Sequence, residues 1–186
     1  MPLVIVLVAA VVLVFYIITL RNSLVATREQ VDRAWANIDV VLKQRFDEIP
    51  QIVSVVEQFA RYEKSIVDKV VASRQRYGAA HTIDEKIASS AALSGALRGL
   101  LAIVENYPEL KANQNFLQLQ SRVSQLEGTI ADRREGYNDS VTLYNTRINQ
   151  FPDSIFAQNL SMRRRPLFQV AEAEKALPNL KMDLGA

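Results

Sequence analysis

The sequence predicts an all-α protein, in which an N-terminal transmembrane helix precedes an antiparallel helical bundle. Three observations carry this prediction. An uncharged apolar run opens the chain, apolar residues then recur at steps of three and four, and only six Gly and six Pro residues interrupt the 186-residue sequence. Steps of three and four match the helical period, whereas a half-buried strand would alternate every second residue.

The first element is the apolar run at residues 3–20, which contains no charged residue, no Gly and no Pro. A run of about 18 such residues is long enough to cross the hydrocarbon core of a bilayer. A cleaved signal peptide is the alternative, but no basic residue precedes the run and no small-residue cleavage motif follows it. We therefore predict an uncleaved anchor at residues 1–21.

The charges around the run predict its orientation. Arg21, Arg28 and Arg33 follow it, and no Lys or Arg precedes it. The positive-inside rule then predicts a single-pass protein of the cytoplasmic (inner) membrane, with its N-terminus outside and its bundle in the cytoplasm. The opposite orientation stays open, because so short an N-terminal tail gives the rule little to compare. The absence of Cys fits a reducing compartment but does not require one.

The apolar stripes predict that residues 22–152 form the bundle. Breakers between helix-length patterns are short, which is typical of antiparallel neighbours. Residues 153–186 are predicted to be a mostly irregular tail with a short helix near 170–177. The helix boundaries carry recognisable signals: a Thr82–Glu85 capping-box pair, Pro108 after Tyr107, an Asn cap at Asn113 or Asn115, and Pro152 after Phe151.

Pro50 leaves the helix count open between three and four. It can open a second helix at its first turn, where Pro is favoured. It can instead kink one long helix, because the apolar stripe runs through it in phase. In the third helix, small residues are interpreted as close packing inside the bundle, in preference to a separate oligomer face: Ala88, Ser89, Ser90, Ala91, Ala92, Ser94, Gly95 and Ala96.

The types of residue in the chain argue against catalysis. The chain has one His, His81, and no Cys, and it has neither a P-loop nor a dinucleotide-binding glycine motif. We therefore predict no catalytic residue, no cofactor, no metal site and no enzymatic activity. A net charge of +2 gives no case for nucleic-acid binding.

The stretch YPELKANQNFLQLQ at residues 107–120 resembles the LemA family of bacterial membrane proteins. The resemblance covers nearly the whole chain, and its further residues are Ala34-Trp35, Ile38-Asp39-Val40, Leu42-Lys43, Arg45, Ile49-Pro50, Ile52-Val53, Glu127, Ile130, Arg133, Tyr137-Asn138, Val141, Tyr144-Asn145 and Phe151-Pro152. It implies an N-terminal transmembrane helix and an antiparallel up-and-down four-helix bundle with long helices, which favours a break at Pro50. The tail departs from the family pattern, because residues 160–165 stand where a Gly-Phe pair is usual.

The resemblance implies less about function. No catalytic residues carry over from the family. One magnetosome branch of the family is linked to membrane organelle formation, and other members sit near membrane proteases.

Three arginines, Arg28, Arg45 and Arg133, interrupt otherwise apolar stripes. Each either lies at the edge of its stripe with its head in water, or is buried and paired with a carboxylate such as Asp39, Glu63, Glu105 or Glu127. We expect pairing for Arg133.

Tyr137-Asn138 and Tyr144-Asn145 are spaced so that they share a helix face. They form either a peptide-binding ledge or, as is commoner, packed tyrosines that bond a neighbouring group. Arg163, Arg164 and Arg165 form the basic run of the tail. In a four-helix arrangement they return toward the bilayer, where anionic lipid headgroups would bind them; a solvated run is the alternative.

Together these features predict a membrane-anchored helical scaffold that self-associates or organises partners at the cytoplasmic face. The expected partners are membrane lipids, further copies of the chain and possible membrane proteases. The alternative is a regulatory or adaptor subunit of a membrane protease or envelope-stress system.

Overall fold

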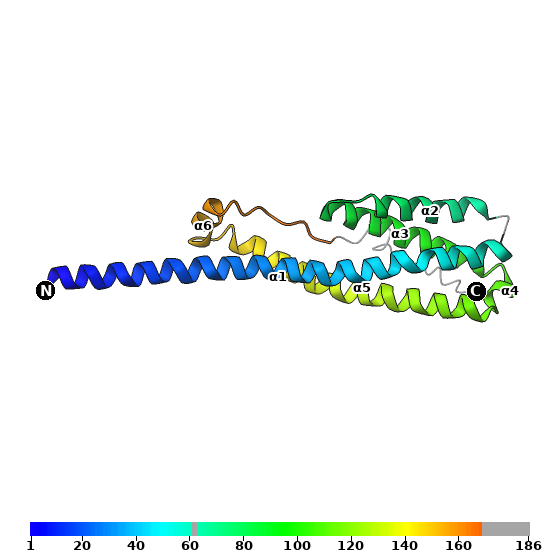
Figure 1. Cartoon of the computed structure of the whole chain (residues 1–186), viewed down its shortest axis with the longest axis horizontal. Coiled ribbons are helices and arrows are strands. Elements are labelled where there is room, and N and C mark those ends of the chain that lie inside the picture. The colour runs from blue at the N-terminus through cyan, green and yellow to red at the C-terminus, as the bar shows by residue number, and fades with distance from the viewer. Residues whose placement is uncertain (61–62, 169–186) are drawn as a thin grey trace, which may run out of the picture. The chain divides into compact units, whose positions relative to one another are not determined.

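The computed structural model describes residues 1–60 and 63–168, and these contain helices without any strand. The helices are α1 (Pro2–Phe59), α2 (Lys64–Gly78), α3 (Ile83–Val104), α4 (Pro108–Lys111), α5 (Gln114–Arg147) and α6 (Asp153–Asn159) (Figure 1). The all-α prediction is confirmed for this part of the chain. The chain divides into two compact units, the first built from Met1–Glu48 and Ser121–Leu167 and the second containing Ile49–Gln120.

The N-terminal part of α1 exposes its apolar side chains. Exposure runs from 76% at Leu3 to 36% at Ile17, and it falls to 8% only at Leu20. The most apolar window of α1 has a mean hydropathy of 3.2. This segment is compatible with a single-pass membrane anchor. Helix α3 is also long and apolar enough to cross a membrane, with a mean hydropathy of 1.6. The core helix of a soluble protein can have the same length and composition.

The break at Pro50 that the resemblance favoured is wrong. Helix α1 continues through Pro50 to Phe59, and α2 begins at Lys64. A proline inside a helix removes one backbone hydrogen bond and crowds the preceding turn. Burial of the flanking stripe offsets that cost, because Ile49, Ile52 and Val56 are at most 1% exposed.

In the first unit, α1 and α5 pair in antiparallel fashion. The α5 partners run from Arg122 up to Arg147, while their α1 partners run from Glu48 down to Ser23. Between these ends the two helices bury the predicted stripes, and the buried residues are Leu24, Val31, Ile38 and Leu42 on α1 and Val123, Ile130, Tyr137, Val141 and Tyr144 on α5.

In the second unit, α2 and α3 form a hairpin joined by residues 79–82 (Figure 1). The predicted capping box is present: the Thr82 hydroxyl accepts the Glu85 backbone N–H at 3.2 Å, and the Glu85 carboxylate accepts the Thr82 N–H at 3.1 Å. Asn113 is the residue that caps α5, through Phe116 N–H to Asn113 Oδ1 at 3.0 Å. Both signals predicted the helix boundaries correctly, because each side chain accepts a hydrogen bond from a backbone N–H that has no partner within the helix.

The small residues of α3 do not all pack inside the fold. Ser90 is 2% exposed, but Ala88, Ala92 and Gly95 lie on the exposed side of the helix. A Cβ atom added to Gly95 or Gly99 would meet nothing within 4 Å. The expectation of close packing is therefore wrong for these positions, because the larger residues Leu93, Leu97 and Leu100 supply the buried face.

Beyond α5, the chain turns at residues 148–152 into the seven-residue helix α6 and then runs without regular structure through residues 162–168. The short helix expected near 170–177 lies outside the described residues.

Candidate functional site

The repeated Tyr-Asn residues of α5 bind the backbone of the chain's own tail. We call residues 163–166 the C-terminal strap. The Tyr144 hydroxyl donates to the Arg163 carbonyl at 3.1 Å, and the Tyr137 hydroxyl donates to the Pro166 carbonyl at 2.9 Å. The two tyrosines therefore follow the commoner of the two interpretations, because each bonds a neighbouring group of the same polypeptide.

Asn145 completes this attachment. Its Nδ2 donates to the Arg165 carbonyl and its Oδ1 accepts the Arg165 N–H, both at 2.9 Å. One amide side chain thus satisfies both backbone groups of a single residue, as a neighbouring strand would do. Asn138, the matching residue one heptad earlier, is half-buried on the same helix.

Both tyrosines are enclosed, with exposed fractions of 0% for Tyr137 and 1% for Tyr144. The Tyr137 ring meets the Trp35 ring edge-on at a centroid distance of 5.6 Å, which is a favourable aromatic geometry. Burial raises the pKa of Tyr144 above 10.0, against the opposing effect of the nearby Arg165 and Arg28 charges. The hydroxyl therefore remains a donor to the strap at neutral pH.

Arg45 is buried and paired, as one of the two sequence interpretations required. Its side chain is 0% exposed and its Nη1 lies 2.6 Å from Glu127 Oε1, on α5. The Glu127 side chain keeps 35% exposure, so one end of the ion pair reaches water. A second α1–α5 ion pair joins Glu48 to Arg122 at 2.6 Å.

The expectation of buried pairing for Arg133 is wrong. Arg133 is exposed and its Nη1 donates to the Asn37 carbonyl at 3.2 Å. Its position between Ile130 and Tyr137 suggested burial, but it lies one residue off the buried face. Arg28 is half-buried, and its Nη2 lies 3.5 Å from Glu29 Oε1.

The three arginines of the tail have different environments. Arg163 and Arg164 are exposed, whereas Arg165 is half-buried and pairs with Asp32 of α1 at 3.0 Å. Arg165 therefore helps to hold the strap against α1.

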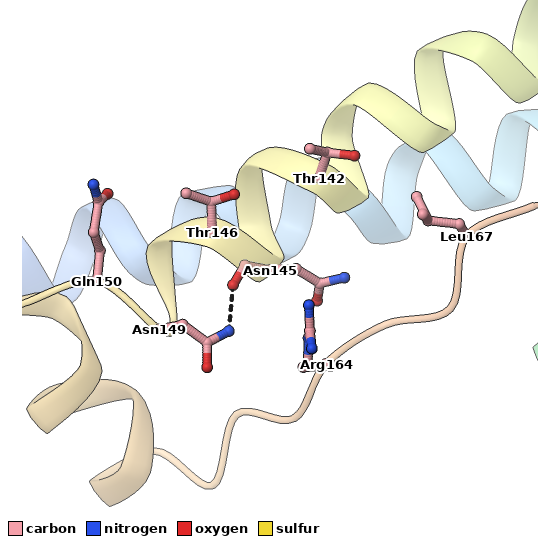
Figure 2. Close-up of a pocket in the computed structure, with 7 residues that line it drawn as sticks. All are labelled: Thr142, Asn145, Thr146, Asn149, Gln150, Arg164 and Leu167. Atoms are coloured by element: carbon pink, nitrogen blue, oxygen red, sulfur yellow. Dashed lines mark hydrogen bonds between the residues drawn. The ribbon is translucent and has the colours of Figure 1, made fainter.

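A groove of about 460 Å³ lies between α5 and the strap (Figure 2). Most of its lining residues have polar side chains, but their apolar atoms make up most of the exposed wall. The lining residues are Thr142, Asn145, Thr146, Asn149, Gln150, Arg164 and Leu167. Amide and hydroxyl groups beside one guanidinium suit a polar or anionic group. Among the side chains of residues 1–60 and 63–168, no three His, Cys, Asp or Glu gather into a potential metal site.

Sequence reasoning missed Arg147, the residue that joins three segments. Its Nε lies 2.8 Å from Asp153 Oδ2 of α6, and its Nη1 lies 2.8 Å from Ser23 Oγ and 3.0 Å from Thr27 Oγ1 of α1. The available signal was a basic residue in the last turn of one helix and an acidic residue in the first turn of the next.

Comparison with known proteins places this fold in context. The sequence model of the LemA family matches residues 34–182. The chain is 25% identical to the protein LemA of Metamycoplasma hominis over 168 residues, which is 87% of this chain and 75% of that protein.

Shorter similarities link the chain to magnetosome proteins. It is 32% identical over 74 residues to magnetosome protein MamQ 2 of Paramagnetospirillum magneticum, covering 40% of this chain and 27% of that protein. It is also 32% identical over 73 residues to magnetosome protein MamQ of Magnetospirillum gryphiswaldense, at 39% and 27% coverage.

Proposed function

We propose, from the premise that this chain belongs to the LemA family, that it is a membrane-anchored helical scaffold that self-associates or organises partners and carries out no reaction. The observation that carries the proposal is the single helix α1. It joins an exposed apolar segment to a packed body without a break at the boundary near residue 21. An anchor continuous with the body transmits the orientation of one to the other.

The proposed anchor is residues 3–20, with the N-terminus outside and the helical body at the cytoplasmic face of the inner membrane. The support for this orientation is the positive charge of Arg21, Arg28 and Arg33 on one side of the apolar run. We further propose that the four long helices α1, α2, α3 and α5 act as an up-and-down bundle, because their connections are short.

Self-association is proposed to use the exposed apolar side chains of the α1–α5 pair. Val40 on α1 is 58% exposed and Leu143 on α5 is 49% exposed. Burial of these side chains against a second helix would be favourable. The similarity to magnetosome proteins over part of the chain supports the proposed scaffold role.

The mass of the full-length protein in mild detergent and in lipid nanodiscs tests the proposal. Light scattering should give a multimer, and chemical cross-linking in native membranes should trap the same species. The double variant Val40→Glu, Leu143→Glu should shift the population toward monomer at least tenfold. Gln30→Glu, which adds one charge at an exposed α1 position, should leave the mass unchanged.

A monomer in both environments, with no cross-linked copy, would overturn the self-association. The adaptor hypothesis makes the opposite prediction in the same samples. It requires a stoichiometric membrane protease in detergent pull-downs together with a monomeric chain.

A further inference from the structure

The end of α5 lies at the level where the apolar run of α1 ends. Arg147, the last residue of α5, donates to Ser23, only a few residues beyond Leu20. The same guanidinium binds Asp153, the first residue of α6. One side chain therefore holds the start of α6 within a few ångströms of the end of the apolar run, which is consistent with the place of α6 beside α1 in Figure 1.

The turn at this level presents apolar side chains to the outside. We call Phe151 and Ile155 the α5–α6 corner. Phe151 is 81% exposed and Ile155 is 53% exposed. Beyond residue 20, Phe151 has the largest exposed fraction of any large apolar side chain in the described part of the chain.

Exposure at this corner is not explained by packing within the unit. Ala157 is 2% exposed and Ile148 is 8% exposed, so the inward face of the same segment is already buried. Burial of a phenyl ring favours folding by about 1.5–3 kcal/mol, and this ring forgoes that gain in water. A phenyl ring at the edge of a bilayer recovers much of it at the boundary between headgroups and acyl chains, where interfacial helices bury Trp, Phe and Leu side chains.

The charges near the corner match an anionic lipid surface. Arg21, at the end of the apolar run, is exposed, and so are Arg163 and Arg164 at the beginning of the strap. Each basic residue close to a bilayer surface gains about 1 kcal/mol from anionic headgroups. An apolar wedge with basic neighbours is the composition of an interfacial membrane contact.

We propose that the α5–α6 corner is a second membrane contact, in which Phe151 and Ile155 insert into the headgroup region of the leaflet that α1 leaves. This inference rests on the proposed function, because it requires residues 3–20 to span the bilayer. Two points of attachment, at the anchor and at the corner, fix the tilt of the α1–α5 pair on the membrane. An anchor alone would leave that tilt free.

Tryptophan fluorescence of the full-length chain in liposomes tests the insertion. Trp35 is the only Trp, so Trp35→Phe gives a silent background in which Phe151→Trp is the sole reporter. Lipids brominated near the carbonyl end of their acyl chains should quench that reporter several-fold and shift its emission to the blue. Phe15→Trp, within the apolar run, should also be quenched.

The matched control is Ser124→Trp, at an exposed position of α5 outside the proposed self-association surface. Ser124 lies 23 residues before Arg147, about 34 Å along the helix at 1.5 Å of rise per residue, out of reach of the bilayer. Its emission should remain that of an exposed indole, without quenching.

The outcomes separate the two proposals. Quenching of Phe15→Trp with Phe151→Trp behaving as Ser124→Trp overturns the corner contact and leaves the anchor intact. Absence of quenching in Phe15→Trp overturns the anchor, and the corner contact with it. A blue shift of Phe151→Trp without quenching by brominated lipid means that a second protein surface covers the corner, which also overturns the inference.

A second measurement keeps the test independent of Trp35. The chain has no Cys, so Ile155→Cys and Ser124→Cys each accept a single spin label. The label at position 155 should be more accessible to oxygen, which partitions into lipid, than to a water-soluble nickel chelate. The label at position 124 should show the reverse, and equal behaviour at both positions overturns the contact.

Discussion

The α1–α5 pair and the α2–α3 hairpin are both antiparallel helix pairs, but different contacts hold them together. Polar contacts cross the α1–α5 pair along its length, at Arg122–Glu48, Arg45–Glu127 and Arg147–Ser23. The buried residues of the hairpin are mainly apolar, and they include Val67, Val70, Leu93, Leu97 and Leu100.

The difference follows from the distance along the chain between the partners. The short turn at residues 79–82 restricts how α2 and α3 can slide past each other, so apolar packing is sufficient there. Arg45 and Glu127 are separated by 82 residues, and apolar stripes alone tolerate a shift by one turn. A charge that is buried only with its partner penalises the shifted alignments, as polar residues do in coiled coils.

The largest effect is expected in the hairpin, from Leu93→Ala. Leu93 is 0% exposed, and truncation of a buried Leu costs transfer free energy and leaves a cavity, about 3 kcal/mol in total. Hydrogen exchange of the full-length protein should speed up within residues 64–104. Ala88→Ser, at an exposed position of the same helix, should change nothing measurable. An equal increase at residues 20–48 would show that the two pairs do not differ as argued.

A smaller effect is expected from Glu127→Ala, which removes a carboxylate partner of the fully enclosed Arg45 guanidinium. Breaking a buried pair usually costs about 3–5 kcal/mol. We expect about 2 kcal/mol, because Glu127 keeps 35% exposure and water can reach that end of the pair. Thermal unfolding should show the loss, and Glu135→Ala on the exposed face of α5 should not.

The double variant Arg45→Met, Glu127→Leu sharpens the comparison, because it gives the α1–α5 pair an apolar contact like those of the hairpin. Replacement of a buried ion pair by apolar groups is often neutral. The free energy of unfolding should therefore return close to that of the parent chain. Cross-links between α1 and α5 should meanwhile form between a wider set of positions, because the register is less specific. A double variant as unstable as Glu127→Ala would contradict a role in register.

Weaker still is the effect expected from Asn145→Ala, which removes both hydrogen bonds to the Arg165 backbone. Each net hydrogen bond is worth about 1 kcal/mol, so the strap should loosen by about 1–2 kcal/mol. Hydrogen exchange and proteolysis should increase at residues 160–167 and remain unchanged in α3. Asn149→Ala is the matched control, because its side-chain amide donates to the Asn145 carbonyl and not to the strap. Equal effects of the two substitutions would contradict the attachment.

The stripes and boundary signals predicted the helices well because they depend on local chemistry. The Thr82–Glu85 box and the Asn113 cap were found where the sequence placed them. Pro50 misled because its local penalty is outweighed by Ile49, Ile52 and Val56 on a stripe that continues past it. Burial in the tertiary structure decides that the helix continues through Pro50, and a proline in the sequence gives no information about that burial.

The sequence predicted which residues of α5 share a face at the candidate site, but not which groups they contact. The Tyr-Asn spacing correctly placed Tyr137 and Tyr144 on one face, but it could not indicate that residues 163–166 cover that face. Arg45 and Arg133 look alike in sequence, since each interrupts an apolar stripe. A small rotation about the helix axis separates the enclosed arginine from the exposed one, and apolar periodicity alone does not resolve it.

The smallest expected effect concerns the capping box that begins α3. Thr82→Ala removes the acceptor of the Glu85 N–H and should lower the free energy of unfolding by about 1 kcal/mol. Ser89→Ala, whose hydroxyl bonds carbonyls of its own helix, should have less effect. A loss at residue 89 equal to that at residue 82 would contradict the cap.

The same box predicts a dependence on acid. The N–H groups of His81 and Thr82 donate to the Glu85 carboxylate and lower its pKa below the ordinary value of 4.5. Because the folded pKa is the lower one, the contribution is complete above about pH 4.5 and is lost as the pH falls through the folded pKa. Thermal midpoints at pH 7 and pH 3 should therefore converge in Glu85→Gln relative to the parent chain. Asp68→Asn, at an exposed position of α2, should keep the parent's acid dependence. If its thermal midpoints converge equally, the loss of stability at low pH comes from the overall charge of the chain and not from the cap.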